Sequence, residues 1–230
     1  QCSFLPLTHA QIQGLPESAL SMLRDNANLF YEKNKIEKSE SSPLSKGDLG
    51  AFKNSQYVAT LDIPCYIAVM TYAEDRTLRE TLYHAYVTRA SDLFEPKAFD
   101  NAPIMVDILA KRQQKAQLLG FDNFAELSLA TKMADDVATV EQFLRDLAEK
   151  ARPFAQKDLF ELKNEAKHWQ IDSLERDNSL ERDNSLERDN SLEPWDIAFL
   201  AEKVKQRKYN LSQEATRPYF PLPKVLDGLF

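Results

Sequence analysis

The sequence predicts an all-α protein, a mostly helical array with one small strand element. Glycine is scarce, with 5 in 230 residues. Apolar residues also recur at helical spacing far more often than they alternate as in strands. Because 43% of the residues are hydrophobic, the chain has enough apolar material to bury a core.

The first part of the chain combines a helical region with a polar segment. Residues 8–31 predict a helix or a helical pair, with Gly14 and Pro16 marking a break. Residues 33–54 are polar and rich in Lys and Ser, which predicts a long loop.

The strand candidate comes next and is followed by a helix. Tyr57–Ile63 has the residue types of a strand, and we expect Pro64 to close it. Asp75 is placed to cap a helix that runs to about Ala90. Its apolar residues repeat every four positions, at Leu78, Leu82 and Tyr86.

The next helix has clear signals at both ends. Asp100 or Asn101 opens it, Pro103 lies in its first turn, and Gly120 stops it. Its expected apolar stripe consists of Met105, Leu109, Ala116 and Leu119.

Two helices are expected after Gly120. Asp122 caps a short one that continues to Ala134. Thr139 and Gln142 then resemble a capping box ahead of a long helix that carries Val140, Phe143, Leu144 and Leu147. Pro153 has to kink or interrupt this helix.

The C-terminal part contains one more helix, at Trp195–Tyr209, and then a proline-rich segment at Arg217–Pro223 that we expect to be extended. The chain starts at Gln1 and stops in the apolar stretch Val225–Phe230. An apolar stretch normally continues into structure that buries it. We therefore expect residues 1–230 to be a helical section of a longer polypeptide.

A six-residue repeat interrupts the region before the last helix. Residues 176–193 contain Arg-Asp-Asn-Ser-Leu-Glu three times, preceded by a partial copy at Ser173–Glu175. Six residues advance an α-helix by about 600°, so successive leucines fall on different faces. We interpret residues 173–193 as an insertion in a surface loop, with a partner-docking motif as the alternative.

Charge and composition restrict the classes of partner. A net charge of −7 argues against nucleic acid and against an anionic membrane as partners. No apolar run is long enough to span a bilayer. The two cysteines, Cys2 and Cys65, lie far apart, which favours a reducing compartment such as the cytoplasm, with a single disulfide as the alternative.

The residues alone do not assemble a catalytic site. His9, His84 and His168 are widely separated, and none belongs to a His-Glu-x-x-His motif. Glu80 and His84 share a helix face, which fits a surface contact better than a metal or an acid–base pair. Nucleophile-elbow, phosphate-loop and dinucleotide motifs are missing from the sequence as well. We therefore predict no catalytic, cofactor-binding or metal-binding residue in this chain.

Several stretches, in the same order along nearly the whole chain, resemble the oligopeptidase A branch of the thimet oligopeptidase family of zinc metallopeptidases. They are Gly14–Leu20, Leu61–Tyr66, Val69–Tyr72, Arg79–Asp92, Leu118–Phe121, Ser128–Ala134, Pro194–Phe199 and Arg217–Phe230. The loop at 33–54 is longer and more polar than is usual in the family, and the repeat is an apparent insertion.

The resemblance implies a helical section like that of neurolysin and thimet oligopeptidase, in the wall of a deep channel. It also implies that the full-length protein binds zinc and hydrolyses short peptides in the cytoplasm. The zinc-binding helix of the family lies downstream of the stretch that matches, so we expect the isolated chain to be inactive. Its partner would be the catalytic lobe of the same polypeptide, and exposed apolar faces would also favour self-association. The alternative is a non-catalytic peptide-binding or interaction module.

Overall fold

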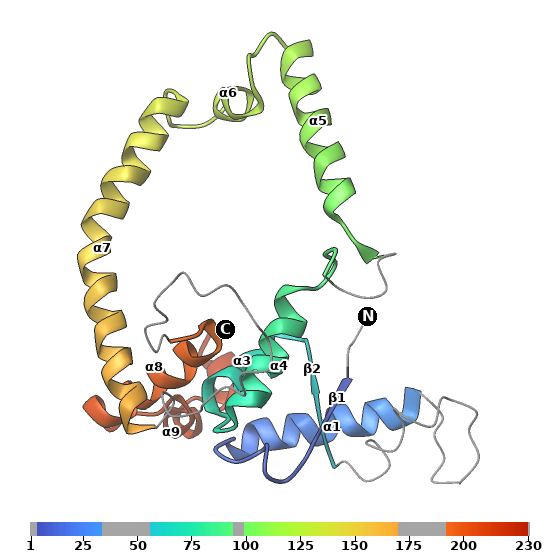
Figure 1. Ribbon diagram of the computed structural model, residues 1–230, viewed down its shortest axis with the longest axis vertical. Helices are drawn as coiled ribbons and strands as arrows, with labels where there is room; N and C mark the ends of the chain where they lie inside the picture. Colours follow the sequence, from blue (N-terminus) through green and yellow to red (C-terminus); the bar gives the residue numbers. More distant parts are fainter. Residues whose placement is uncertain (1–3, 34–55, 94–98, 170–191, 230) are drawn as a thin grey trace, which may run out of the picture. The chain divides into compact units, whose positions relative to one another are not determined.

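The computed structural model describes residues 4–33, 56–93, 99–169 and 192–229 (Figure 1). In these residues the regular structure is helical apart from one two-stranded sheet, which confirms the predicted fold class. The chain divides into two compact units, unit 1 with residues 1–87 and 162–230, and unit 2 with residues 88–161. The loop predicted at 33–54 lies outside the described residues except for Lys33, and so does the repeat except for Leu192 and Glu193.

The sheet of unit 1 joins the N-terminus to the predicted strand. β1 (Phe4–Leu7) pairs antiparallel with β2 (Tyr57–Thr60), with Phe4 opposite Thr60. Every residue of β2 is buried. The strand is shorter than the predicted Tyr57–Ile63, and β1 was not predicted because four residues that include a proline give little periodic signal.

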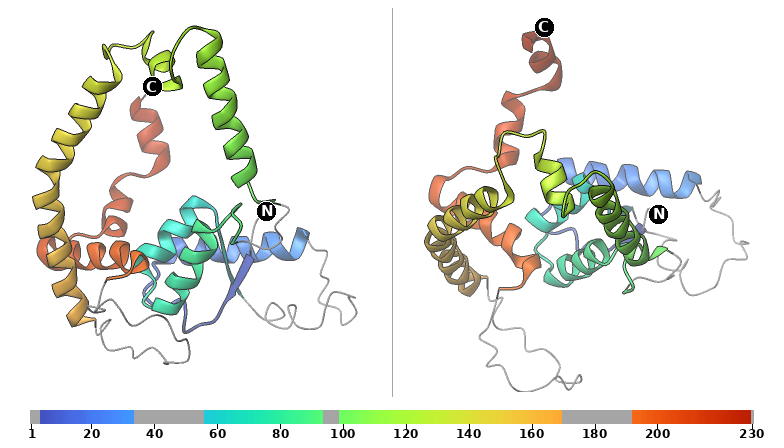
Figure 2. Two further views of the ribbon diagram at one scale, coloured as in Figure 1. Left: turned by 45° about the horizontal axis from the view of Figure 1, so that its top comes forward. Right: turned by 90° about the horizontal axis from the view of Figure 1, so that it is seen from above.

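Helix α1 (Glu17–Lys33), the blue helix of Figure 2, packs against β2. Its buried residues recur with helical spacing, at Ala19, Leu23, Ala27 and Phe30. The helix begins later than the predicted residue 8 because Gly14 has a φ of +83° and turns the chain first.

A hydrogen bond from the residues that follow helix α3 (Ile63–Tyr72) holds the turn before α1. The backbone N–H of Glu74 donates to the carbonyl of Gln13 at 3.0 Å. Pro64 lies in the first turn of α3 and opens this helix, so the prediction that it closes a strand was wrong. Proline suits this position because the first N–H groups of a helix have no partner within it.

Helix α4 (Arg76–Val87) begins as predicted, since the carboxylate of Asp75 accepts from the backbone N–H of Leu78 at 3.0 Å. It ends before the predicted Ala90, which has a φ of +55° and leaves the helical conformation. Together β2, α1, α3 and α4 enclose the main core of unit 1. Its most deeply buried members are Leu23, Ala59, Cys65, Val69, Ala73 and Leu78.

The C-terminal part of unit 1 is helical. It contains α8 (Pro194–Tyr209), the short α9 (Gln213–Thr216), the 3-10 helix η3 (Arg217–Tyr219) and α10 (Leu222–Leu229). The helix predicted at 195–209 is confirmed. The prediction of an extended segment at 217–223 was wrong, because its prolines fall at the starts of two helical turns, where they are tolerated.

Unit 2 contains α5 (Ala102–Leu118), α6 (Phe124–Leu129) and most of α7 (Val137–His168). α5 starts and stops as predicted. α6 is capped by Asn123 rather than Asp122, and it ends at Leu129 instead of Ala134.

The start of α7 also differs from the prediction. The Asp136 carboxylate accepts from the backbone N–H of Thr139 at 2.7 Å, so Thr139 lies inside the helix and does not begin a capping box. Pro153 does not interrupt α7, because a helix of 32 residues keeps its bonds on both sides of a single missing N–H.

Unit 2 buries very little of its apolar surface. Of its residues that the structure describes, only Ala116 is buried. Of the residues predicted for the apolar faces of the two long helices, Ala116 is buried and Val140 is half-buried. The others, Met105, Leu109, Leu119, Phe143, Leu144 and Leu147, are exposed, and so is Phe154 farther along α7. Among the described parts of the chain, no helix is both long enough and apolar enough to cross a membrane.

Candidate functional site

A cluster of three charged side chains lies between α4 and α8. Arg79 donates from Nη2 to Oδ1 of Asp196 at 2.9 Å, and Arg76 donates from Nη2 to Oδ2 at 2.8 Å. The side chains of Arg79 and Asp196 are 1% and 0% exposed. Two arginines one helical turn apart on α4 therefore hold a single carboxylate at the start of α8.

The guanidinium of Arg79 donates a hydrogen bond from each of its three nitrogens. It also donates to the backbone carbonyls of Trp195 at 3.0 Å, Ala73 at 2.7 Å and Glu74 at 3.2 Å. Its carbon lies 4.3 Å from the ring centroid of Phe199. These contacts satisfy a buried cation, which would otherwise be costly to remove from water.

The charges of the cluster support one another. Burial by itself would raise the pKa of Asp196, but hydrogen bonds from Arg76 and Arg79 outweigh burial and hold this pKa below its ordinary value. The hydrogen bond to Asp196 raises the pKa of Arg76, while burial lowers the pKa of Arg79. Because Arg79 and Asp196 are inaccessible, the cluster serves as a structural clamp and not as a site that receives substrate.

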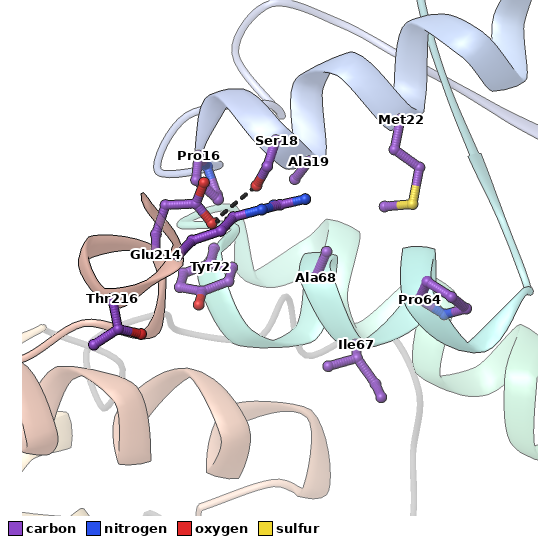
Figure 3. A pocket seen from close by; sticks show the side chains of 11 residues that line it. Pro16, Ser18, Ala19, Met22, Pro64, Ile67, Ala68, Tyr72, Glu214 and Thr216 are labelled. Carbon is purple, nitrogen blue, oxygen red and sulfur yellow. Dashed lines mark hydrogen bonds and ion pairs between the residues drawn. The ribbon is translucent and has the colours of Figure 1, made fainter. Parts of the chain in front are cut away.

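A cavity of about 510 Å³ lies elsewhere in unit 1, among α1, α3 and the α9–η3 segment (Figure 3). Much of its wall is apolar, formed by Pro16, Ala19, Met22, Pro64, Ile67 and Ala68. At one end, Ser18 Oγ donates to Oε2 of Glu214 at 2.9 Å. Burial, with the nearby charges of Glu202 and Glu214, raises the pKa of Tyr72 in the same wall. The lining offers apolar contact and a few polar groups, which suits binding more than catalysis.

The histidines do not form a metal site. His84 Nε2 lies 4.0 Å from Oε1 of Glu80 on α4, which confirms the expected surface contact. His9 packs edge-on against Tyr57, and His168 ends α7. In the part of the chain that the structure describes, no three His, Cys, Asp or Glu side chains are grouped so as to hold a metal ion. The described residues therefore do not fit a zinc site, and the prediction that the chain has none stays a prediction.

Cys65 is a buried free thiol, and Cys2 lies outside the described residues. The Sγ of Cys65 accepts from the backbone N–H of Thr60 at 3.3 Å. Burial raises the pKa of this thiol, which keeps it protonated and unreactive at neutral pH.

Sequence reasoning missed the arginine–aspartate cluster. Its signal was present, since Arg76 and Arg79 are three residues apart on one helix and Asp196 lies in the first turn of another. The partners are more than a hundred residues apart, however, and their pairing depends on how the helices pack. The cavity was missed for the same reason.

Comparison with known proteins places this helical chain among the metallopeptidases. Residues 69–230 match the model of peptidase family M3. The chain belongs to this family, and within it the chain is oligopeptidase A-like, as the resemblance predicted.

Three relatives show how similar the chain is to oligopeptidase A and how much of it the chain covers. Oligopeptidase A of Salmonella typhimurium and that of Escherichia coli are each 42% identical to the chain over 96% of its length. A protein of Arabidopsis thaliana whose name describes a cytosolic oligopeptidase A is 37% identical over the same share. The chain spans 27%, 27% and 26% of these three relatives, respectively, or about a quarter of their length.

Proposed function

We propose that this chain is a helical section of a zinc-dependent oligopeptidase that hydrolyses short peptides in its full-length form. The observation that carries the proposal is the 42% identity to oligopeptidase A along 96% of the chain. Family M3 membership makes a metal-dependent peptidase the parent class. We further propose that the full-length enzyme acts on short peptides and that it does so in the cytoplasm. The name of the Arabidopsis thaliana relative, which describes a cytosolic oligopeptidase A, favours the cytoplasm.

The role we propose for this section is to form part of the wall of the peptide channel. Unit 2 supports this role because its long helices expose apolar stripes and, among its described residues, only Ala116 is buried. Apolar stripes on helices are normally covered by other protein. We propose that the rest of the full-length polypeptide covers these stripes, with the catalytic lobe as the main partner.

The catalytic groups are proposed to lie outside this chain. The sequence contains no His-Glu-x-x-His motif, and the described residues do not fit a metal site. In the full-length enzyme, bound zinc would polarise the peptide carbonyl and lower the pKa of a water molecule. We expect the isolated chain to supply shape and packing and no step of the hydrolysis.

A chimera tests the proposal directly. The matching segment of Escherichia coli oligopeptidase A is replaced by this chain, and cleavage of a quenched fluorescent peptide is measured with and without a chelator. We expect chelator-sensitive cleavage at a rate within about tenfold of the parent enzyme, since the apolar contacts of homologous sections tolerate substitution. A folded chimera without activity would contradict the proposal.

The isolated chain provides the complementary measurement. The purified 230-residue chain is incubated with zinc and the same peptide, and we expect no cleavage above the rate without protein. Chelator-sensitive cleavage by the chain alone would contradict the placement of the catalytic groups outside it.

The alternative function is a non-catalytic peptide-binding module, and the cavity between α1 and α3 is the observation that favours it. Fluorescence anisotropy with labelled short peptides measures binding to the isolated chain. Ile67→Trp would fill the cavity, while Ile63→Trp on the same helix is the matched control outside the lining. These isoleucines are 54% and 59% exposed, so neither change disturbs the core. Binding lost only in Ile67→Trp would support this alternative.

A further inference from the structure

The residues directly before α8 are the last three residues of the repeat. Every copy of the repeat ends in Ser-Leu-Glu, at 173–175, 179–181, 185–187 and 191–193. Only the last of these copies directly precedes Pro194, the first residue of α8. The described residues Leu192 and Glu193 show what this position requires.

Leu192 packs against an apolar cluster formed by Ala166 near the end of α7 and by Phe199 and Leu200 of α8. Glu193 is the N-cap residue of α8, with a ψ of 156°. The extended conformation is the one that a residue before proline prefers. The backbone N–H of Glu193 donates to the Asp196 carboxylate at 3.3 Å.

The packing of α7 against α8 is secured by contacts on either side of the insertion. Oε2 of Glu165 accepts from Nε of Arg207 at 2.8 Å. The ring of Trp169 meets that of Phe199 edge-on, with centroids 5.1 Å apart. At the other end, the arginine–aspartate cluster fixes the first turn of α8 on α4.

We propose that the number of repeat copies can change without altering the fold of unit 1, because any whole number of copies presents Leu and Glu ahead of Pro194. Removal of residues 188–193, 182–193 or 176–193 leaves Ser-Leu-Glu at this place in each case. The identity of the residues directly before Pro194, which we call the phase of the repeat, therefore matters for the fold. The number of copies does not. The segment acts as a spacer of adjustable length between α7 and α8.

The shortest version still has enough chain to close. Without residues 176–193, the four residues 170–173 link Trp169 to the leucine that takes the place of Leu192. Such a link spans up to about 17 Å. Trp169 contacts Phe199, and Leu192 packs against the cluster that contains Phe199, so the two ends that the link has to join are close together. Loop-closure entropy changes only slowly with length, which makes the longer versions equally acceptable.

The test compares in-phase and out-of-phase deletions in the 230-residue chain. Deletion of 6, 12 or 18 residues ending at Glu193 is in phase, whereas deletion of Ser191–Glu193 alone places Asp189 and Asn190 before Pro194. Thermal unfolding is followed by tryptophan fluorescence, which reports on unit 1 because both tryptophans, Trp169 and Trp195, belong to it.

We expect the three in-phase deletions to shift Tm by less than about 3 °C, while the three-residue deletion lowers it by more than about 4 °C. The double substitution Leu192→Asp and Glu193→Asn reproduces the out-of-phase junction at full length, and it should lower Tm as the short deletion does. The proposal is wrong if the in-phase deletions destabilise as much as the short one. It is equally wrong if the double substitution leaves Tm unchanged, because phase would then not matter.

Discussion

Arg79 and Asp196 form a buried ion pair between two helices, with Nη2 and Oδ1 2.9 Å apart and the residues 117 positions apart in the chain. Nη1 of Arg79 donates to the carbonyls of Ala73 and Glu74, and Nε donates to the carbonyl of Trp195. The pair thus joins the end of α3, the body of α4 and the first turn of α8. It holds together the N-terminal and C-terminal parts of unit 1.

Removal of the charge on Asp196 should strongly destabilise unit 1. Asp196→Asn leaves the buried guanidinium of Arg79 without its counter-charge, and we expect a loss of about 3–5 kcal/mol in the free energy of unfolding. Urea unfolding followed by tryptophan fluorescence measures this loss. Glu17→Gln is the matched control, because it neutralises the exposed partner of Arg24 and should cause no measurable change. Equal effects of the two substitutions would contradict the clamp.

The same pair predicts a dependence of stability on acid. Since the folded state lowers the pKa of Asp196 below 3.8, the unfolded chain binds more protons at this site as the pH falls. The contribution of Asp196 is therefore fully present above about pH 4 and decreases as the pH falls toward the folded pKa. Urea midpoints between pH 6 and pH 2.5 should show this loss in the parent chain and a smaller one in Asp196→Asn. Parallel curves for the two proteins would contradict the assignment.

Local signals predicted much of this fold, and the errors at helix ends arose where two local signals competed. Asp75, Gly120 and Tyr209 mark helix ends that the sequence predicted, because caps and stop residues act within one turn. Thr139 misled the prediction because Asp136, three residues earlier, takes the capping role. The prolines at 218–223 were read as extended although they also suit the starts of helices.

The candidate sites were less predictable than the helices. The partners of Arg79 and the walls of the cavity come from segments far apart in sequence. Periodicity describes one helix at a time, so it gives no signal for such pairings. The family resemblance, in contrast, depended on residue identities along the whole chain and was confirmed by the family match.

Gly14 should tolerate substitution less well than Gly120. Both have positive φ, at +83° and +81°, so an alanine at either position costs about 1–2 kcal/mol of backbone strain. A Cβ at Gly14 would also lie 2.5 Å from the backbone oxygen of Tyr72, whereas a Cβ at Gly120 meets nothing within 4 Å. We therefore expect Gly14→Ala to cost at least about 1 kcal/mol more than Gly120→Ala. Hydrogen exchange of the amides around each glycine measures both costs, and equal costs would show that the contact is relieved without strain.

The exposed stripe of α7 should matter only when the rest of the enzyme is present. Phe154 is 71% exposed in this chain, so Phe154→Ser should change the stability of the isolated chain by less than about 0.5 kcal/mol. In the oligopeptidase A chimera, where we propose that the stripe is covered, the same change should cost about 3–5 kcal/mol and reduce peptide cleavage at elevated temperature. Glu149→Ser, on the opposite face of α7, is the control and should be neutral in both settings. If Phe154→Ser were also neutral in the chimera, the stripe would face solvent in the complete enzyme, and α7 would not belong to a packed channel wall.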